Sequence, residues 1–102
     1  MDVFAALADP TRRRIVELLA LGGAQPAGMI ASAFDSARPT ISRHLKVLRE
    51  AGVVRVRTVA QERYYQLDAR ELARVQAWIA RHRRLWEERL NALERAVERE
   101  LP

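Results

Sequence analysis

Basic side chains are concentrated between residues 37 and 65, where one lysine and six arginines stand against two glutamates. These basic residues are Arg38, Arg43, Lys46, Arg49, Arg55, Arg57 and Arg63. The rest of the chain has equal numbers of basic and acidic residues, so the segment accounts for the whole formal net charge of +5. Concentrated positive charge attracts polyanions, and clustered arginine is typical of nucleic-acid-binding surfaces.

The first part of this basic segment has the period of an amphipathic helix. Ile41, Leu45 and Leu48 recur at intervals of four and three, which directs them to the core. The opposite face can then donate hydrogen bonds to base edges and phosphates in a DNA major groove. We expect DNA contacts from Arg38, Pro39, Thr40, Ser42, Arg43, Lys46, Arg57 and Arg63. Of these, Arg38, Ser42 and Arg43 are assigned to base edges, whereas Thr40 and Lys46 are assigned to phosphates.

Capping residues and apolar periods define the elements that position this surface. Asp-Pro at residues 9–10 is a strong helix start, because Asp accepts hydrogen bonds from the first turn and Pro has no N–H to leave unpaired. Alternating apolar residues predict a hairpin, and a long stretch without Gly or Pro predicts a long terminal helix. The predicted helices cover residues 2–7, 10–22, 26–34, 37–51 and 69–101, and the predicted strands cover residues 54–58 and 63–67.

This order of elements predicts a winged helix-turn-helix, a mainly α fold with a small β-hairpin and a long C-terminal helix. The chain has 102 residues, of which 49% are hydrophobic, so we expect one domain over residues 1–102. Within it, residues 1–68 form the expected DNA-binding core and residues 69–102 the expected dimerisation helix.

The terminal helix carries a wider apolar stripe than so small a core can cover. Such a stripe on a terminal helix is usually buried against a second copy of the chain. We therefore expect a homodimer in which the first helix covers the flank of the stripe. The predicted interface consists of Val3, Phe4, Leu7, Leu72, Val75, Ile79, Trp86, Leu90, Leu93 and Val97.

Two segments resemble the ArsR-type family of bacterial winged-helix transcriptional regulators. They are Leu-Ala-Asp-Pro-Thr-Arg at residues 7–12 and the segment from Pro39 to Val54, which is similar to the family's recognition helix and wing entry. The terminal helix resembles the thiol-free branch of that family. The resemblance implies a homodimeric repressor that binds a pseudo-palindromic operator through the helix at residues 37–51.

The sequence departs from the family pattern at two places. The wing tip has Ala60-Gln61 where the family usually has Gly-Arg, so it lacks the arginine that would contact DNA at the tip. Ala37 stands where a capping Ser is usual, so we expect Ser36 to cap the recognition helix instead.

Catalytic, cofactor and metal sites are not expected. The absence of cysteine excludes thiolate sites and a cysteine nucleophile, and His82 is a single imidazole on the terminal helix, too few to bind a metal ion. A metal- or small-molecule-responsive sensor of the same fold and a winged-helix protein-interaction module remain alternatives. With neither a signal peptide nor a membrane-spanning stretch, we expect a cytoplasmic protein with double-stranded DNA as its partner.

Overall fold

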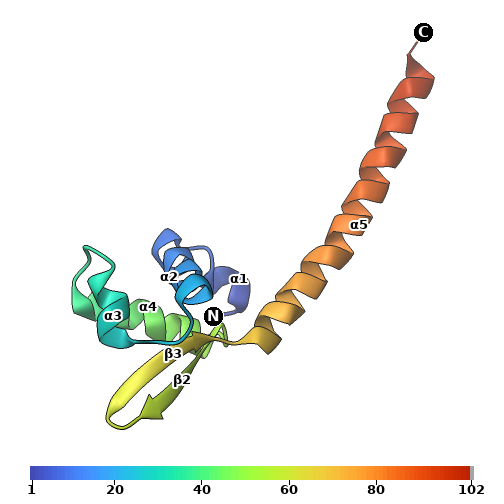
Figure 1. Ribbon diagram of the computed structural model, residues 1–102. Coiled ribbons are helices and arrows are strands. Elements are labelled where there is room, and N and C mark those ends of the chain that lie inside the picture. Colours follow the sequence, from blue (N-terminus) through green and yellow to red (C-terminus); the bar gives the residue numbers. More distant parts are fainter. Residues whose placement is uncertain (102) are drawn as a thin grey trace. The chain divides into compact units, whose positions relative to one another are not determined.

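The computed structural model describes residues 1–101 and contains five helices and three strands within that range (Figure 1). In chain order these are α1 (Val3–Ala6), α2 (Pro10–Gly22), β1 (Gln25–Pro26), α3 (Ala27–Ser32), α4 (Arg38–Glu50), β2 (Val54–Val59), β3 (Glu62–Leu67) and α5 (Ala69–Glu100). The chain divides into two units, Met1–Leu72 and the residues from Ala73 onward. The division lies within α5.

Helix α2 begins and ends where its capping residues predict. The Asp9 carboxylate accepts a hydrogen bond of 3.0 Å from the backbone N–H of Arg12, and Pro10 is the first helical residue. Gly23 follows the helix with a φ of 72°, a conformation that residues with a Cβ rarely adopt. The predicted start and end of this helix are confirmed.

Strands β2 and β3 form the predicted hairpin, and a short third strand extends it. The hairpin register pairs Val54 with Leu67 at its base and Val59 with Glu62 at its tip. Strand β1 pairs antiparallel with β3, so the sheet order is β1-β3-β2. No local pattern predicted β1, because two residues are too few to show an alternation.

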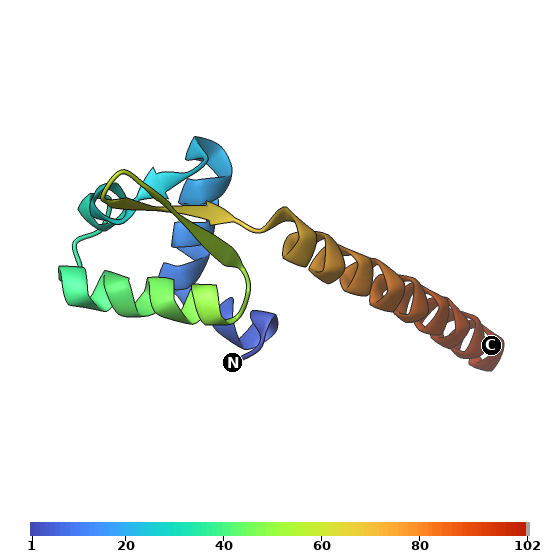
Figure 2. The ribbon, with the colours of Figure 1, turned by 90° about the horizontal axis from the view of Figure 1, so that it is seen from below.

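The core of the first unit lies between the helices and one face of the hairpin. Figure 2 shows this unit from below, with α4 next to the hairpin. Helix α4 contributes its predicted apolar face, and the strands contribute the side chains nearest the hairpin base. The buried apolar residues are Val3, Ala6, Ile15, Leu19, Ile30, Ile41, Leu45, Leu48, Val53, Val54 and Tyr65.

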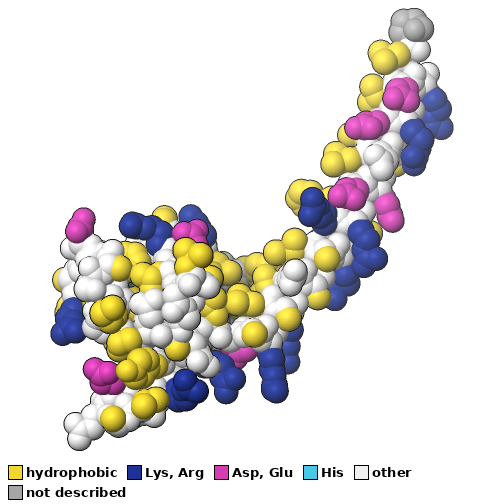
Figure 3. Space-filling model, in the orientation of Figure 1, with side chains coloured by type: hydrophobic (Ala, Val, Ile, Leu, Met, Phe, Trp, Pro, Cys, Tyr) yellow, Lys and Arg dark blue, Asp and Glu magenta, His cyan; other side chains and the backbone are white. Residues whose placement is uncertain are grey.

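Helix α5 is a single helix of 32 residues, as the unbroken helical period predicts. None of its described residues is buried. Hydrophobic side chains follow one side of the helix and arginines follow another (Figure 3). Trp86 keeps 68% of its surface exposed and Leu93 keeps 60%, values unusual for side chains of this size on a helix with a continuous apolar stripe.

Removal of the Asp9 cap should destabilise the first unit. The backbone N–H of Arg12 lowers the pKa of Asp9, so the charged cap stabilises the fold above the ordinary Asp pKa, and this stabilisation is lost as the pH falls through the lowered value. We expect Asp9→Ala to lower the free energy of unfolding by about 1 kcal/mol at pH 7, and Asp9→Asn, which still caps, to lower it far less. Urea unfolding at one fixed chain concentration measures both. If Asp9→Ala lowered the free energy of unfolding as much at pH 2.5 as at pH 7, the result would contradict a charged cap.

Candidate nucleic-acid interface

The outer face of α4 presents most of the predicted DNA-binding residues to solvent. Its buried face, formed by Ile41, Leu45 and Leu48, sets this orientation because the two faces lie on opposite sides of one helix. Thr40 is half-buried, which leaves less of its side chain available than the prediction assumed. The exposed members of the predicted set on this helix are Arg38, Pro39, Ser42, Arg43 and Lys46.

The start of α4 is not capped as predicted. Ala37 is the N-cap residue, with extended backbone, and no side chain accepts a hydrogen bond from the first turn. The prediction that Ser36 caps this helix is therefore wrong. Pro39 has no backbone N–H, and the N–H groups of Thr40 and Ile41 donate to the Ala37 carbonyl oxygen at 3.0 and 3.2 Å, so an anion such as a DNA phosphate would depend mainly on side chains at this helix start.

His44 lies at the border between the two faces of α4 rather than on the outer face. Its side chain keeps 19% of its surface exposed, and its Nδ1 lies 3.3 Å from an Arg12 guanidinium nitrogen and 3.9 Å from the Asp9 carboxylate. These contacts give His44 a packing and hydrogen-bonding role within the first unit.

A groove of about 610 Å³ lies between α4 and the hairpin. Lys46 and Arg49 line it from α4, and Arg63 lines it from β3, against one carboxylate, that of Glu50. The Arg63 guanidinium lies 5.8 Å from the centre of the Tyr65 ring, a cation–π distance. The groove thus gathers three cations from two elements. The predicted set omitted Arg49, although its spacing from Ser42 and Lys46 places it on the same side of the helix.

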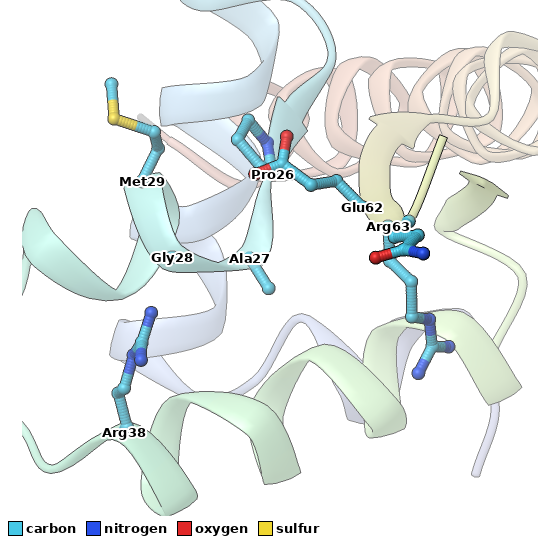
Figure 4. A pocket seen from close by; sticks show the side chains of 8 residues that line it. Pro26, Ala27, Gly28, Met29, Arg38, Glu62 and Arg63 are labelled. Carbon is cyan, nitrogen blue, oxygen red and sulfur yellow. The ribbon is translucent and has the colours of Figure 1, made fainter. Parts of the chain in front are cut away.

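A second cleft, of about 530 Å³, adjoins the start of α4. Figure 4 shows the Arg38 side chain directed from α4 toward Gly28 of α3, and the Arg63 guanidinium directed toward α4. A Cβ on Gly28 would lie 2.7 Å from Nη2 of Arg38, so the glycine leaves room for this arginine. Arg63 lines both cleft and groove and therefore makes one continuous cationic surface with α4.

The structure separates the two predicted wing arginines. Residues that pair across antiparallel strands share a face, so Arg63, paired with Thr58, lies on the same face as Tyr65. Arg57 pairs with Tyr64 and lies on the opposite face of the hairpin. On that face the Tyr64 hydroxyl donates to the Glu62 carboxylate at 3.1 Å, and this hydrogen bond raises the pKa of Tyr64. The groove therefore contains Arg63 but not Arg57.

The wing tip is a two-residue turn with an unusual backbone. Ala60 has a φ of 56°, in the left-handed region that favours glycine. Gln61 completes the turn between the paired residues Val59 and Glu62. The tip therefore adopts a conformation suited to the glycine that the family pattern carries, with alanine in its place.

The predicted dimer residues fall into three classes of exposure. Val3 is buried within its own chain, and Leu7, Leu72 and Val75 are half-buried. The exposed members are Phe4, Ile79, Trp86, Leu90, Leu93 and Val97.

His82, on the same stripe, stacks on Trp78. The ring centres of His82 and Trp78 are 3.8 Å apart, and Nδ1 lies 2.9 Å from the Trp78 carbonyl oxygen. Among residues 1–101, no group of three or more His, Cys, Asp or Glu side chains is placed to bind a metal ion. Within the same range, no helix combines the length and hydropathy needed to cross a membrane.

Comparison with known proteins identifies relatives of the DNA-binding part. Residues 7–57 match the family model of a helix-turn-helix domain. The transcriptional repressor SdpR of Bacillus subtilis is 45% identical over 67 residues, which cover 66% of this chain and 73% of SdpR. The arsenical resistance operon repressor of Escherichia coli is 36% identical over 81 residues, which cover 79% of this chain and 66% of that protein.

Solved structures show the same fold over more of the chain. An ArsR-like transcriptional regulator from Rhodococcus superposes with a TM-score of 0.79 at 32% identity, covering 92% of this chain and 88% of its own. A homodimeric winged helix-turn-helix DNA-binding domain from Mycobacterium bovis superposes with a TM-score of 0.65 at 32% identity, covering 76% and 71%. These structures confirm the predicted fold class.

Glycine at the wing tip should stabilise the protein. An L-residue in the left-handed region is strained by about 1–2 kcal/mol, and glycine removes this strain at a smaller cost in chain entropy. We expect Ala60→Gly to raise the free energy of unfolding by about 0.5 kcal/mol and Ala60→Val to lower it. Ala77→Gly, at an exposed position within α5, is the control and should lower it by about 1 kcal/mol. Equal losses for the two glycine variants would show that the tip is unstrained.

Proposed function

This chain belongs to the ArsR family of winged helix-turn-helix DNA-binding transcriptional regulators, and we propose that it acts as a homodimeric repressor. In this proposal each copy inserts α4 into the major groove of one half of a pseudo-palindromic operator. The protein then acts in the cytoplasm, on the DNA that it regulates.

The observation that carries the proposal is the cationic surface shared by α4 and β3. A protein-interaction module would have no need to gather Lys46, Arg49 and Arg63 around one groove. The groove suits a phosphate of the DNA backbone, whereas the exposed side chains nearer the start of α4 suit base edges. We assign Arg38, Ser42 and Arg43 to bases.

The remaining predicted contacts are assigned to the DNA backbone. Thr40 and Pro39 lie in the first turn of α4, where the Thr40 hydroxyl can donate to a phosphate oxygen and Pro39 can pack against the sugar-phosphate backbone. Arg57, on the other face of the hairpin, contacts the backbone independently of the groove. In this assignment the two wing arginines bind different phosphates.

The exposed stripe of α5 supports the homodimer. A second copy of the same stripe is the partner that buries it by symmetry. The charge of α5 supports an antiparallel pair: residues 69–86 carry five arginines and one glutamate, and residues 87–100 carry three arginines and five glutamates. Antiparallel pairing sets the cationic half of each helix against the acidic half of the other. The two-fold axis then relates two α4 helices about 34 Å apart, one turn of B-DNA.

Base readout and phosphate contact should be separable by substitution. With ~6–10 phosphate contacts per dimer, affinity should fall ~10³–10⁵-fold between 50 and 200 mM salt. We expect Arg43→Ala to lose ~1–3 kcal/mol on a duplex selected from a random-sequence library and far less on a scrambled duplex. Arg49→Ala should weaken binding to both duplexes alike and lower the salt slope by about one. Fluorescence anisotropy titrations measure all three.

Two results of these titrations would contradict the proposal. Binding that does not depend on salt would favour the protein-interaction module. Equal losses on the selected and scrambled duplexes for Arg43→Ala would remove this residue from base readout.

A charge on the α5 stripe should prevent dimer formation. Leu93→Glu places a carboxylate from each copy within the proposed interface, at a cost of several kcal/mol, so we expect monomers in sedimentation velocity at micromolar concentration. Asn91→Glu is the matched control, because residue 91 lies on the opposite side of α5 from residue 93. It should remain dimeric. A dimeric Leu93→Glu protein would show that the interface lies elsewhere.

A further inference from the structure

Two neighbouring arginines of α2 bind the carbonyl groups at the end of α1. Arg13 donates through Nη1 to the carbonyl oxygens of Leu7 at 2.9 Å and Ala8 at 3.0 Å. Arg12 donates through Nε to the carbonyl oxygen of Ala6 at 2.6 Å and through Nη2 to that of Ala5 at 3.4 Å. The four-residue α1 is too short to be stable alone, so these arginines fix it against α2.

Arg12 differs from Arg13 in one respect, which is its reach to α4. Its Nη1 lies 3.3 Å from Nδ1 of His44. A guanidinium can only donate hydrogen bonds, so His44 Nδ1 must accept this one and the imidazole proton lies on Nε2. One side chain of α2 thus connects the end of α1 to α4.

The position of His44 on α4 gives this contact its effect. The buried face of α4 packs through apolar side chains, whose contacts have little directional preference. A hydrogen bond from a residue at the border of that face is directional, so it resists rotation of α4 about its own axis. Rotation would displace Arg43, the next residue toward the helix start, sideways across the base edges.

We infer that Arg12 is a positioning residue for DNA recognition, which acts through His44 to set the rotation of α4 relative to α1. The inference rests on the proposed function, because it assumes that α4 contacts base edges. It also links a short helix expected to flank the dimer interface to the helix expected to bind the operator. Arg12 itself is not assigned to DNA.

The neighbouring arginine provides the control for a test. Arg12→Ala removes both the α1 contacts and the His44 contact, whereas Arg13→Ala removes α1 contacts alone. On a duplex selected by the wild-type protein from a random library, we expect Arg12→Ala to bind about 10-fold more weakly. On a scrambled duplex its affinity and salt slope should be unchanged. Arg13→Ala should keep the wild-type ratio of selected to scrambled affinity. Sedimentation and urea unfolding establish that each variant is folded and dimeric at the concentrations used.

Variants at His44 test whether the effect passes through the hydrogen bond. His44→Leu removes the acceptor and should match Arg12→Ala, and the double variant should bind no more weakly than either single variant. His44→Asn places an amide oxygen near the position of Nδ1 and should recover most of the selected-duplex affinity.

Three outcomes would overturn the inference. They are additive losses in the double variant, equal losses for Arg12→Ala and Arg13→Ala, and no recovery with His44→Asn. Failure of the proposed function is distinguishable, because the wild-type protein would then select no duplex over the scrambled one.

Discussion

The burial of one face of α4 is the interaction on which the rest of the structure depends. Ile41, Leu45 and Leu48 are almost completely removed from water, and burial of each such side chain stabilises the fold by about 1.5–3 kcal/mol. With about 3.6 residues per turn, three buried positions decide which face of the helix is directed outward. The exposure of Ser42 and Arg43 is thus a consequence of core packing. The same packing places Arg49 beside the hairpin.

Helix α5 shows the opposite relation between sequence and burial. Its apolar stripe is as regular as that of α4, yet none of its described residues is buried within one chain. Large exposed side chains such as Trp86 and Leu93 make this stripe unfavourable in water. In the proposed dimer their burial supplies the association energy. The α4 stripe therefore stabilises the fold of one copy, and the α5 stripe supplies the contact between two.

Local patterns predicted most of the fold, whereas several details of the site depend on contacts distant in sequence. The Asp9 cap, the α4 period and the hairpin alternation each act within a few residues and were correct. Strand β1 forms because β3 offers backbone groups to pair with, and no local pattern encodes it. Ala37 is the N-cap residue because its backbone is extended, and no side chain caps the helix there, so no capping residue marks this helix start in the sequence. The pairing of Arg12 with His44 joins positions 32 residues apart, beyond the reach of periodicity.

The positions of the cations on the wing indicate why specific DNA binding depends on the dimer. The tip carries Ala60 and Gln61 and so adds no cation, whereas Arg63 lies on the face directed toward α4. In the proposed complex Arg63 therefore contacts a phosphate at the groove, close to the bases that α4 contacts, and Arg57 contacts a separate phosphate. Each copy then covers a short stretch of DNA with few contacts, which limits its affinity for a single half-site. Two copies joined through α5 bind both half-sites at a high effective concentration, so specific binding depends on the dimer as much as on α4.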